Sequence, residues 1–418
     1  QDDAPVIRLI NGLIAEAARQ GASDIHVEPF ETSLRVRLRV DGVMREVLDL
    51  PARLAPLLVS RIKVMARLDI AEKRVPQDGR IKLNLSKTKQ IDFRVSTLPT
   101  LFGEKIVLRI LDGSAAKLGI DKLGYEPAQQ QLFLDAIHKP YGMVLVTGPT
   151  GSGKTVSLYT ALGILNDETR NISTAEDPVE IRLPGVNQVQ QNNKRGMTFA
   201  AALRSFLRQD PDIIMVGEIR DQETAQVAIE ASLTGHLVLS TLHTNSAPET
   251  ILRLLDMGMD PFNFADALLG ILAQRLAKRL CSCKQAYVPD EAELRDFVRE
   301  FSLDLRHTPE WRDDPATAER HLLERWRTDY GTPTQGLQMY RAVGCERCNG
   351  SGYKGRVGLH ELLIADDTLK RLVQERARVA ELLTAALATG MHTLKMDGME
   401  KVLMGLTDLK QVRSVCIK

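Results

Sequence analysis

The first hundred residues carry two different spacings of apolar side chains, one helical and one extended. Apolar residues from Pro5 to Gln20 recur three and four positions apart, which predicts an amphipathic helix that ends near Gly21. From Leu34 to Val40 the period becomes two, because leucines and valines alternate with three arginines. That alternation predicts a strand with one buried and one basic face, and Asp41-Gly42 after it is a hairpin turn signal.

The same extended pattern returns twice before the composition changes. Ile91–Leu98 and Lys105–Leu111 are both predicted as strands, so we expect a small α+β domain over residues 1–113. Small and polar residues from Asp112 to Ala116 mark the start of a linker, which we place at residues 114–123.

From about Gly124 the chain alternates short apolar runs with helical stretches. The runs are strand-sized and lie at Met143–Thr147, Ile172–Ala175, Asp212–Val216 and His236–Thr241. Continuous apolar strands separated by helices are typical of a mostly parallel sheet covered on both faces. We therefore predict an α/β domain at 124–280, then a cysteine-containing segment at 281–365 with a charged insertion, and a helical tail at 366–418.

Composition limits the class of protein without deciding its function. The chain has 418 residues, of which 44% are hydrophobic and 26% charged, and its net charge is +1. These values are typical of a multidomain globular protein and give no bias toward nucleic acid or an anionic membrane. No apolar run approaches the ~20 residues that span a bilayer, and five cysteines suit a reducing compartment. The chain begins at Gln1 instead of Met, so we expect a preceding N-terminal segment.

Residues 148–155 match the P-loop pattern G-x-x-x-x-G-K-[ST] in full. The match follows an apolar strand and precedes a predicted helix at Val156–Leu165, which is the context that this motif requires. In such a loop, backbone N–H groups surround phosphate oxygens, the lysine reaches the β- and γ-phosphates, and the hydroxyl holds Mg²⁺. We therefore predict an ATP site formed by Gly148, Pro149, Thr150, Gly151, Ser152, Gly153, Lys154 and Thr155.

Two acidic residues follow other predicted strands and are candidates for the water-activating base. Glu218 comes after the run Asp212–Val216, and Glu176 comes after Ile172–Ala175. A carboxylate at the carboxyl end of a strand beside a P-loop orients the attacking water or holds the hydration shell of Mg²⁺. The sequence does not separate the two glutamates. We interpret the nearby Glu180 as a solvated or bridging carboxylate.

Two histidines bracket the last predicted strand of the α/β domain. His243 is followed by Thr244-Asn245-Ser246, which places hydrogen-bonding groups at the edge of the sheet where a γ-phosphate would lie. We therefore predict that His243 is a phosphate sensor. The role of His236 stays open between a structural and a functional one.

These motifs together resemble those of the type II/IV secretion-system ATPases. The resemblance rests on the P-loop, Thr174–Glu180, Val216–Asp221 and His236–His243, with Ser23–Pro29 and Arg74–Arg80 in the first domain. Within that family the chain looks most like the assembly ATPase of type II secretion, general secretory pathway protein E. The type IV pilus extension ATPase is the second candidate, and the paired cysteines argue against a retraction ATPase.

The resemblance implies a RecA-like P-loop ATPase domain, a PAS-like first domain and a C-terminal metal-binding element with four cysteines. It further implies a homo-hexamer in which ATP lies between the P-loop domain and the first domain. Arginines of the first domain would complete the site, and the matching positions are Arg94 and Arg109. Both alternate with apolar residues, so they lie on the polar faces of their predicted strands, which agrees with this role.

The resemblance also implies partners and a location. They are the cytoplasmic domain of an inner-membrane secretion protein and a polytopic membrane platform protein, which would hold a cytoplasmic motor at the inner face of the inner membrane. Membrane association would thus be peripheral. The family carries a further N-terminal docking domain, and this chain begins after it. We therefore expect the isolated chain to be weakly active and monomeric.

Two groups of charged residues receive structural interpretations. Arg204 and Arg208 lie four positions apart in a predicted helix and so share one face, which favours an interface or structural role. Asp24, His26 and Glu28 share one face of a predicted strand, and we interpret them as a hydrogen-bonded cluster.

Two other classes of P-loop protein fit the sequence less well than a secretion ATPase. A motor acting directly on nucleic acid needs a basic groove with stacking aromatics, whereas this chain is near neutral and 5% aromatic. A nucleotide-dependent scaffold without hydrolysis is disfavoured by two acids and two candidate finger arginines around one P-loop.

Four of the five cysteines form two pairs that are typical of a structural zinc site. The second pair, Cys345 and Cys348, has the spacing Cys-x-x-Cys that the family's element carries, followed by a flexible Asn-Gly-Ser-Gly turn. The first pair, Cys281 and Cys283, departs from it because only one residue separates the thiols. We predict that these four hold structural Zn²⁺ and that Cys416 is not a ligand.

Overall fold

The structure is a computed structural model that describes residues 4–84, 87, 90–111 and 119–416. The chain divides into two compact units, Gln1–Ala115 and Ala116–Lys418. The predicted start of the linker, Asp112–Ala116, lies outside the described residues. The finer division of the second unit after residues 280 and 365 stays a prediction.

The first unit is a six-stranded antiparallel sheet with two helices. The helices are α1 (Ala4–Gln20) and α2 (Ala55–Met65). The strands are β1 (Ala22–Pro29), β2 (Ser33–Val40), β3 (Val43–Pro51), β4 (Gln77–Asn84), β5 (Gln90–Thr100) and β6 (Gly103–Leu111). They lie in the order β3-β2-β1-β6-β5-β4. The predicted helix and strands of this region are therefore confirmed.

One face of this sheet is the core of the first unit and the other is charged. In β2, Leu34, Val36, Leu38 and Val40 are buried and pack with apolar residues of α1 and α2. The side chains that alternate with them point away from that core, because neighbouring residues of a strand face opposite sides. The charged face carries the three arginines of β2, as the alternation in the sequence predicts.

The second unit is built on a seven-stranded sheet in the order β15-β12-β7-β11-β10-β8-β9. Its strands are β7 (Gly142–Thr147), β8 (Ile172–Glu176), β9 (Asn187–Gln190), β10 (Ile213–Val216), β11 (Leu237–Leu242), β12 (Leu268–Leu280) and β15 (Tyr353–Ile364). Every pairing is parallel except that of β12 with β15. The predicted α/β class and the mostly parallel sheet are confirmed.

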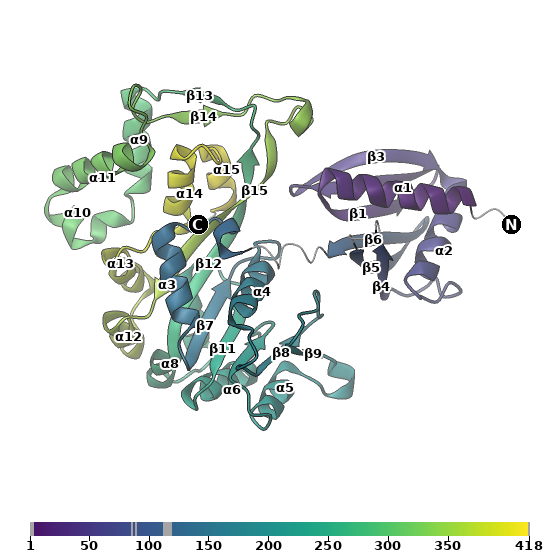
Figure 1. The fold of residues 1–418 in the computed structure, drawn as a ribbon, viewed down its shortest axis with the longest axis horizontal. Helices are drawn as coiled ribbons and strands as arrows, with labels where there is room; N and C mark the ends of the chain where they lie inside the picture. The colour runs from purple at the N-terminus through teal and green to yellow at the C-terminus, as the bar shows by residue number, and fades with distance from the viewer. Residues whose placement is uncertain (1–3, 85–86, 88–89, 112–118, 417–418) are drawn as a thin grey trace. The chain divides into compact units, whose positions relative to one another are not determined.

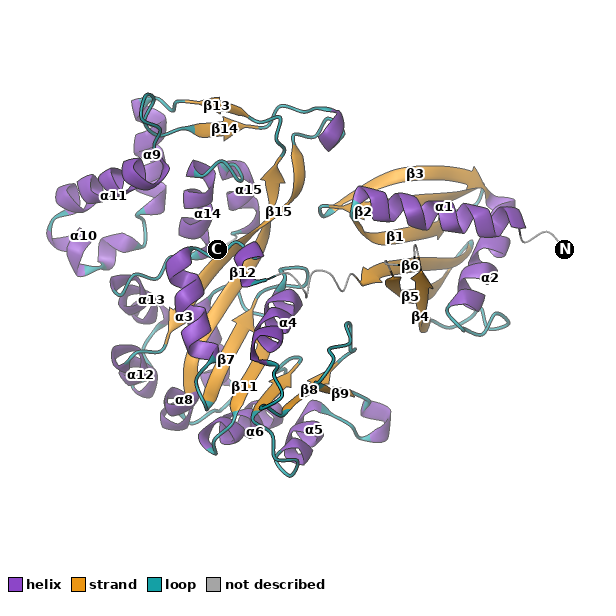
Figure 2. Ribbon diagram, viewed as in Figure 1, coloured by secondary structure: helices purple, strands orange, loops and turns teal. Residues whose placement is uncertain are grey.

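Helices cover both faces of this sheet (Figures 1 and 2). The face with α3 (Pro127–Ile137) and α4 (Lys154–Leu165) receives Val144 and Val146 of β7. The opposite face receives Met143 and Leu145 of the same strand. That face packs against α5 (Phe199–Phe206), α6 (Gln222–Leu233), α7 (Ala247–Asp256) and α8 (Pro261–Ala267). Burial on both sides explains why the strands are continuous apolar runs.

Besides β15, the segments after β12 form a two-stranded antiparallel sheet and two groups of helices. The small sheet pairs β13 (Gln285–Tyr287) with β14 (Met339–Arg341). The charged insertion folds as α9 (Glu291–Phe301), α10 (Pro309–Asp313) and α11 (Pro315–Tyr330). The tail is α12 (Asp367–Gln374), α13 (Val379–Ala388), α14 (Leu394–Leu403) and α15 (Leu409–Val415). None of the helices in the described part of the chain has the length and apolar character that a membrane span requires.

Candidate functional site

Four parallel strands of the second unit end at the same edge of the sheet, and each is followed by a candidate functional group. Strand β7 leads into the P-loop and β11 leads into His243. Strand β10 precedes Glu218, and Glu176 is the last residue of β8. Because the carboxyl ends of parallel strands meet at one edge, the order β7-β11-β10-β8 brings these groups together.

The P-loop residues form the predicted turn between β7 and the start of α4. Helix α4 begins at Lys154, and its N-cap Gly153 has a φ of +88°, a left-handed conformation that favours glycine. The first N–H groups of a helix point outward at its positive end, so this turn is suited to bind phosphate. The geometry agrees with the predicted nucleotide site.

Lys154 lies beside His243 at the bottom of this turn. Its Nζ is 2.9 Å from Nδ1 of His243 and 3.4 Å from the carbonyl oxygen of Leu242. Burial lowers the pKa of Lys154 to about 8, and the positive charge of Arg275 adds to that effect while Glu218 opposes it. A lysine desolvated in this way gains strongly from an anionic phosphate next to it.

Glu218 connects His243 to Arg220. One carboxylate oxygen is 2.9 Å from Nε2 of His243, and the other is 2.6 Å from Nε of Arg220. Lys154, His243, Glu218 and Arg220 thus form a continuous chain of polar contacts across the edge of the sheet. Only the His243 ring separates Glu218 from the P-loop lysine, so this carboxylate lies near the predicted phosphate site.

Glu176 lies in a different environment. It is 4% exposed, and its carboxylate accepts hydrogen bonds from Tyr159, from Thr174 Oγ1 at 2.7 Å and from Gln188 Nε2 at 3.0 Å. Burial and the neighbouring carboxylate raise the pKa of Tyr159. Three donors already occupy the Glu176 carboxylate, which suits a structural role in the wall of the site. We therefore expect Glu218 to be the base, and this choice stays a prediction.

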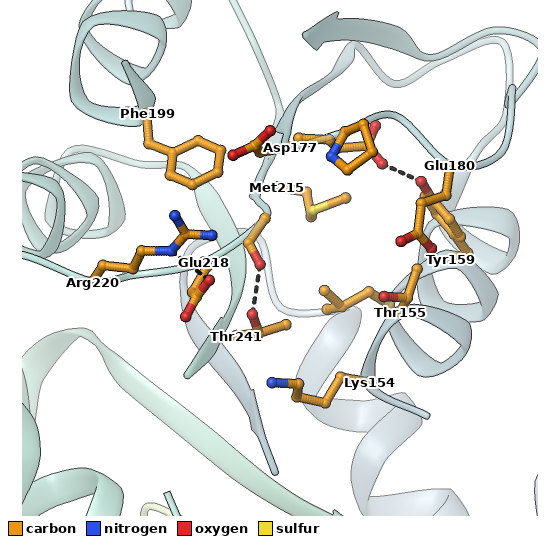
Figure 3. Close-up of a pocket in the computed structure, with 14 residues that line it drawn as sticks. Lys154, Thr155, Tyr159, Asp177, Glu180, Phe199, Met215, Glu218, Arg220 and Thr241 are labelled. Atoms are coloured by element: carbon orange, nitrogen blue, oxygen red, sulfur yellow. Dashed lines mark hydrogen bonds and ion pairs between the residues drawn. The ribbon is translucent and has the colours of Figure 1, made fainter. Parts of the chain in front are cut away.

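A cleft joins Lys154, Glu176 and Glu218 (Figure 3). Its lining includes Lys154, Thr155, Glu218, Arg220 and Phe199. The side chains around it come from the ends of β8, β10 and β11 and from the starts of α4 and α5. Arg220 was not predicted as a site residue, although it stands two positions after Glu218 in the motif Val216–Asp221. Its place within this unbroken motif was the sequence signal that could have identified it.

Arg94 and Arg109 are neighbours in the first unit. They lie directly opposite each other on β5 and β6, so both point to the charged face of the sheet. Nε of Arg109 is 3.1 Å from Oδ1 of Asp24, which stands opposite it on β1. The structure thus brings together the two arginines that the sequence analysis selected, and their catalytic role stays a prediction.

Of the predicted hydrogen-bonded cluster on β1, Asp24 and Glu28 are bonded to arginines of neighbouring strands. The prediction is wrong for Nδ1 of His26, which is buried and has no hydrogen-bond partner among the described residues. Glu28 binds Arg37 at 2.6 Å and Arg35 at 3.2 Å. Burial alone would raise the pKa of this carboxyl, but the two guanidinium groups lower it to about 2.

One expectation about the helix near Arg204 is wrong. Helix α5 is capped by Thr198 and ends at Phe206, so Arg208 lies in the turn after the helix and not on its face. Arg204 stays on the helix and pairs with Glu223 at 2.6 Å. His236 Nδ1 is 2.9 Å from the carbonyl oxygen of Ala231, a local contact that favours its structural interpretation.

The four paired cysteines converge as predicted. Their sulfur atoms all lie within 4.8 Å of one another, with separations of 3.7 Å (Cys281–Cys345), 3.9 Å (Cys283–Cys348) and 3.8 Å (Cys345–Cys348). Thiolates at ~2.3 Å from a tetrahedral zinc are ~3.8 Å apart, so the cluster fits such an ion. Burial opposes ionisation of Cys348, yet N–H groups of Cys345 and Gly352 lower its pKa to about 6.

Comparison with known proteins points to one family. The family model described as "Type II/IV secretion system protein" matches residues 1–414. The type IV pilus assembly ATPase PilB of Acinetobacter baylyi is 54% identical over 99% of this chain and 67% of its own length. The type II secretion system protein E of Pseudomonas aeruginosa is 50% identical over 99% of this chain and 76% of its own length.

Solved structures agree with this result. The pilus retraction motor PilT with bound ADP has a TM-score of 0.64 at 25% identity and covers 97% of this chain and 96% of its own. The ATPase DotB of Legionella pneumophila has a TM-score of 0.67 at 20% identity, covering 97% of this chain and 95% of its own. The latter likeness concerns the fold alone.

Proposed function

The chain belongs to the type II/IV secretion system protein family and is a secretion ATPase, and from this we propose that it powers pseudopilus assembly and protein export in type II secretion. The contact chain from Lys154 through His243 to Glu218 supports ATP hydrolysis at the end of the parallel sheet. Relatives named for type II secretion, at 50% and 48% identity, carry the assignment to that system. A second candidate is type IV pilus extension, which relatives named PilB at 54% and 51% identity favour.

In the proposed mechanism the γ-phosphate lies between Lys154 and Glu218. Lys154 pairs with the β- and γ-oxygens, and Glu218 accepts a proton from the attacking water. The water oxygen forms a bond to the γ-phosphorus while the bond to the β–γ bridging oxygen breaks. His243 contacts both residues and so is positioned to sense the phosphate. Mg²⁺ bound with the nucleotide at the Thr155 hydroxyl would neutralise phosphate charge.

Other parts of the proposal concern assembly. We assign Arg94 and Arg109 to the developing charge on the γ-phosphate within a homo-hexamer, and we assign Zn²⁺ to the four-cysteine cluster. Partners would be an inner-membrane secretion protein and a polytopic platform protein at the cytoplasmic face of the membrane. Closure of the first domain on ATP and its release after hydrolysis would supply the motion that these partners use.

Complementation decides between the two candidate functions. The full-length gene is introduced into a secretion-null strain and into a pilus-null strain, each lacking its own ATPase. We expect it to restore secretion of an exported enzyme and not surface pili. Recovery of pili without secretion would replace the main proposal by the second candidate.

Nucleotide affinity should depend on pH because the pKa of Lys154 is low. Burial lowers this pKa to about 8, and bound phosphate would raise it again, so binding above that pH takes up one proton. We expect the affinity for ADP to be nearly constant from about pH 6.5 to about pH 7.5 and to fall up to about tenfold per unit above about pH 8.5. Calorimetric titrations in two buffers of different ionisation enthalpy measure both the affinity and the proton uptake. An affinity that stays constant to about pH 10, with no proton taken up, would contradict the role of Lys154.

The cysteine cluster should hold about one zinc ion per chain. Cys348 touches Cys345 and Cys283, so Cys348→Ser removes a central ligand and should lower metal content severalfold. Cys416→Ser is the matched control, because Cys416 follows α15 and lies outside the cluster. Elemental analysis of freshly purified, reduced protein gives the metal content of each variant. Equal zinc in wild type and Cys348→Ser, or well under one equivalent in wild type, would refute the assignment.

A further inference from the structure

Strand β12 passes beside the P-loop, and its residue Gln274 touches the loop at both ends. Ala273 pairs with Thr147 of β7, which places Gln274 level with Gly148. A Cβ added at Gly148 would lie 2.7 Å from the carbonyl oxygen of Gln274. A Cβ added at Gly153 would lie 2.6 Å from Nε2 of the same residue. The first and last glycines of the loop therefore both lie against Gln274, which is 4% exposed.

Hydrogen bonds fix which way the Gln274 amide points. Ser157 Oγ on α4 donates to Oε1 of Gln274 at 2.6 Å. Since the Ser157 proton is used there, Tyr125 donates to Ser157 Oγ across 3.3 Å. Burial raises the pKa of Tyr125 to about 12, so it keeps its proton at neutral pH. The carbonyl side of the amide thus faces the helix and the NH₂ side faces Gly153.

Arg275, the next residue of β12, links the loop after β11 to the same strand. Nη1 of Arg275 donates to the carbonyl oxygen of Gln274 at 2.8 Å, and Nη2 donates to that of Asn245 at 3.2 Å. Asn245 follows His243 by two positions, so the loop that carries His243 is held through Arg275. Gln274 and Arg275 together connect β12 to the loops that bear Lys154 and His243.

We propose that Gln274 is a positioning residue of the nucleotide site: it holds the P-loop and the first turns of α4 in the conformation that binds phosphate. This inference rests on the proposed function and adds a residue to the same site. A phosphate-binding loop that is already ordered loses less entropy when the nucleotide binds, so its affinity is higher. Gln274 would act on affinity and not on the chemical step, because it touches the loop and not the reacting atoms.

The test compares two buried glutamines. Gln274→Met keeps the volume and removes both polar ends of the side chain. Gln129→Met is the matched control: Gln129 is 7% exposed, donates through Nε2 to the carbonyl oxygen of His360 at 3.1 Å and accepts from the backbone N–H of Glu126 at 3.1 Å. Neither partner belongs to the P-loop. We expect Gln274→Met to weaken ADP binding by about tenfold and to raise KM for ATP similarly, with kcat within about threefold of wild type. Gln129→Met should leave the affinity unchanged while lowering the melting temperature comparably.

A double-mutant cycle with Ser157→Ala tests the contact itself. Once Ser157→Ala has removed the donor to Gln274, adding Gln274→Met should cost less affinity than it does alone. Equal ADP affinity in Gln274→Met and Gln129→Met, or a loss that appears in kcat alone, would overturn the positioning role. If wild type bound no nucleotide, the proposed function would fall as well. If wild type bound ADP and hydrolysed ATP while Gln274→Met did the same with unchanged KM, only this inference would fall.

Discussion

Glu218→Gln should slow ATP hydrolysis by about 10²- to 10⁴-fold while leaving nucleotide affinity within a few-fold of wild type. The amide keeps the shape of the side chain and its contact with His243 or Arg220, but it does not accept the proton of the attacking water. Stopped-flow binding of a fluorescent ATP analogue and steady-state phosphate release measure the two effects separately. Glu223→Gln is the control, because Glu223 lies on the exposed side of α6 and pairs only with Arg204 among the described ion pairs.

Glu176→Gln distinguishes the two candidate glutamates. Its carboxylate accepts three hydrogen bonds, so the amide places a donor against donors, and we expect the thermal stability to fall. The assignment of the base to Glu218 would fail if Glu176→Gln lost turnover at unchanged stability while Glu218→Gln kept it.

Arg94→Ala or Arg109→Ala should reduce turnover by about 10³-fold or more, because an arginine that meets the developing phosphate charge supplies an effect of that size. Binding of nucleotide should persist, since the P-loop itself is intact. Two quantities are measured on the same preparation of the assembled homo-hexamer: phosphate release and nucleotide affinity. Near-normal turnover in both variants would remove the two arginines from the site.

Arg8→Ala is the matched control for these two variants. Arg8 is exposed on α1, and this helix packs on the opposite face of the sheet from Arg94 and Arg109. A loss of activity in Arg8→Ala equal to that in Arg94→Ala would indicate general damage to the first unit. We expect it to behave as wild type.

The elements that the sequence predicted well are those in which buried side chains recur at a regular spacing. Alternation in β2 and the continuous apolar runs of β7 and β11 each follow from how many faces of the strand are covered. The P-loop was predictable for a similar reason, because all of its phosphate-binding residues are consecutive in the sequence. Local patterns of this kind do not depend on distant partners.

Features that depend on distant partners were not predictable. The sequence left Glu176 and Glu218 equivalent, because both follow apolar strands. In the structure their environments differ, because Tyr159 and Gln188 donate hydrogen bonds to Glu176. Gln274 carried no motif signal, since its role comes from the pairing of β12 with β7. Only the register of the sheet brings it to the P-loop.

The end of α5 and the charged insertion show the same limit. The prediction that Arg204 and Arg208 share one face of a helix is wrong, because the helix ends at Phe206, before the second arginine. In the insertion, Trp326 is fully buried against Phe301 with ring centroids 4.9 Å apart, and its Nε1 lies 3.3 Å from Glu400 of α14. The charged insertion folds against α14, and the hydrogen-bond partner of Trp326 lies 74 residues away in the sequence. The insertion's own sequence therefore does not reveal this contact.

The central claim is that this chain hydrolyses ATP at the cleft between the P-loop and Glu218. Steady-state phosphate release from ATP tests it most directly, measured for wild type and Glu218→Gln with Mg²⁺ and with excess EDTA. The account predicts release by wild type that requires Mg²⁺ and that Glu218→Gln reduces to near background. Release that is equal in the two proteins, or that persists unchanged in EDTA, would contradict it.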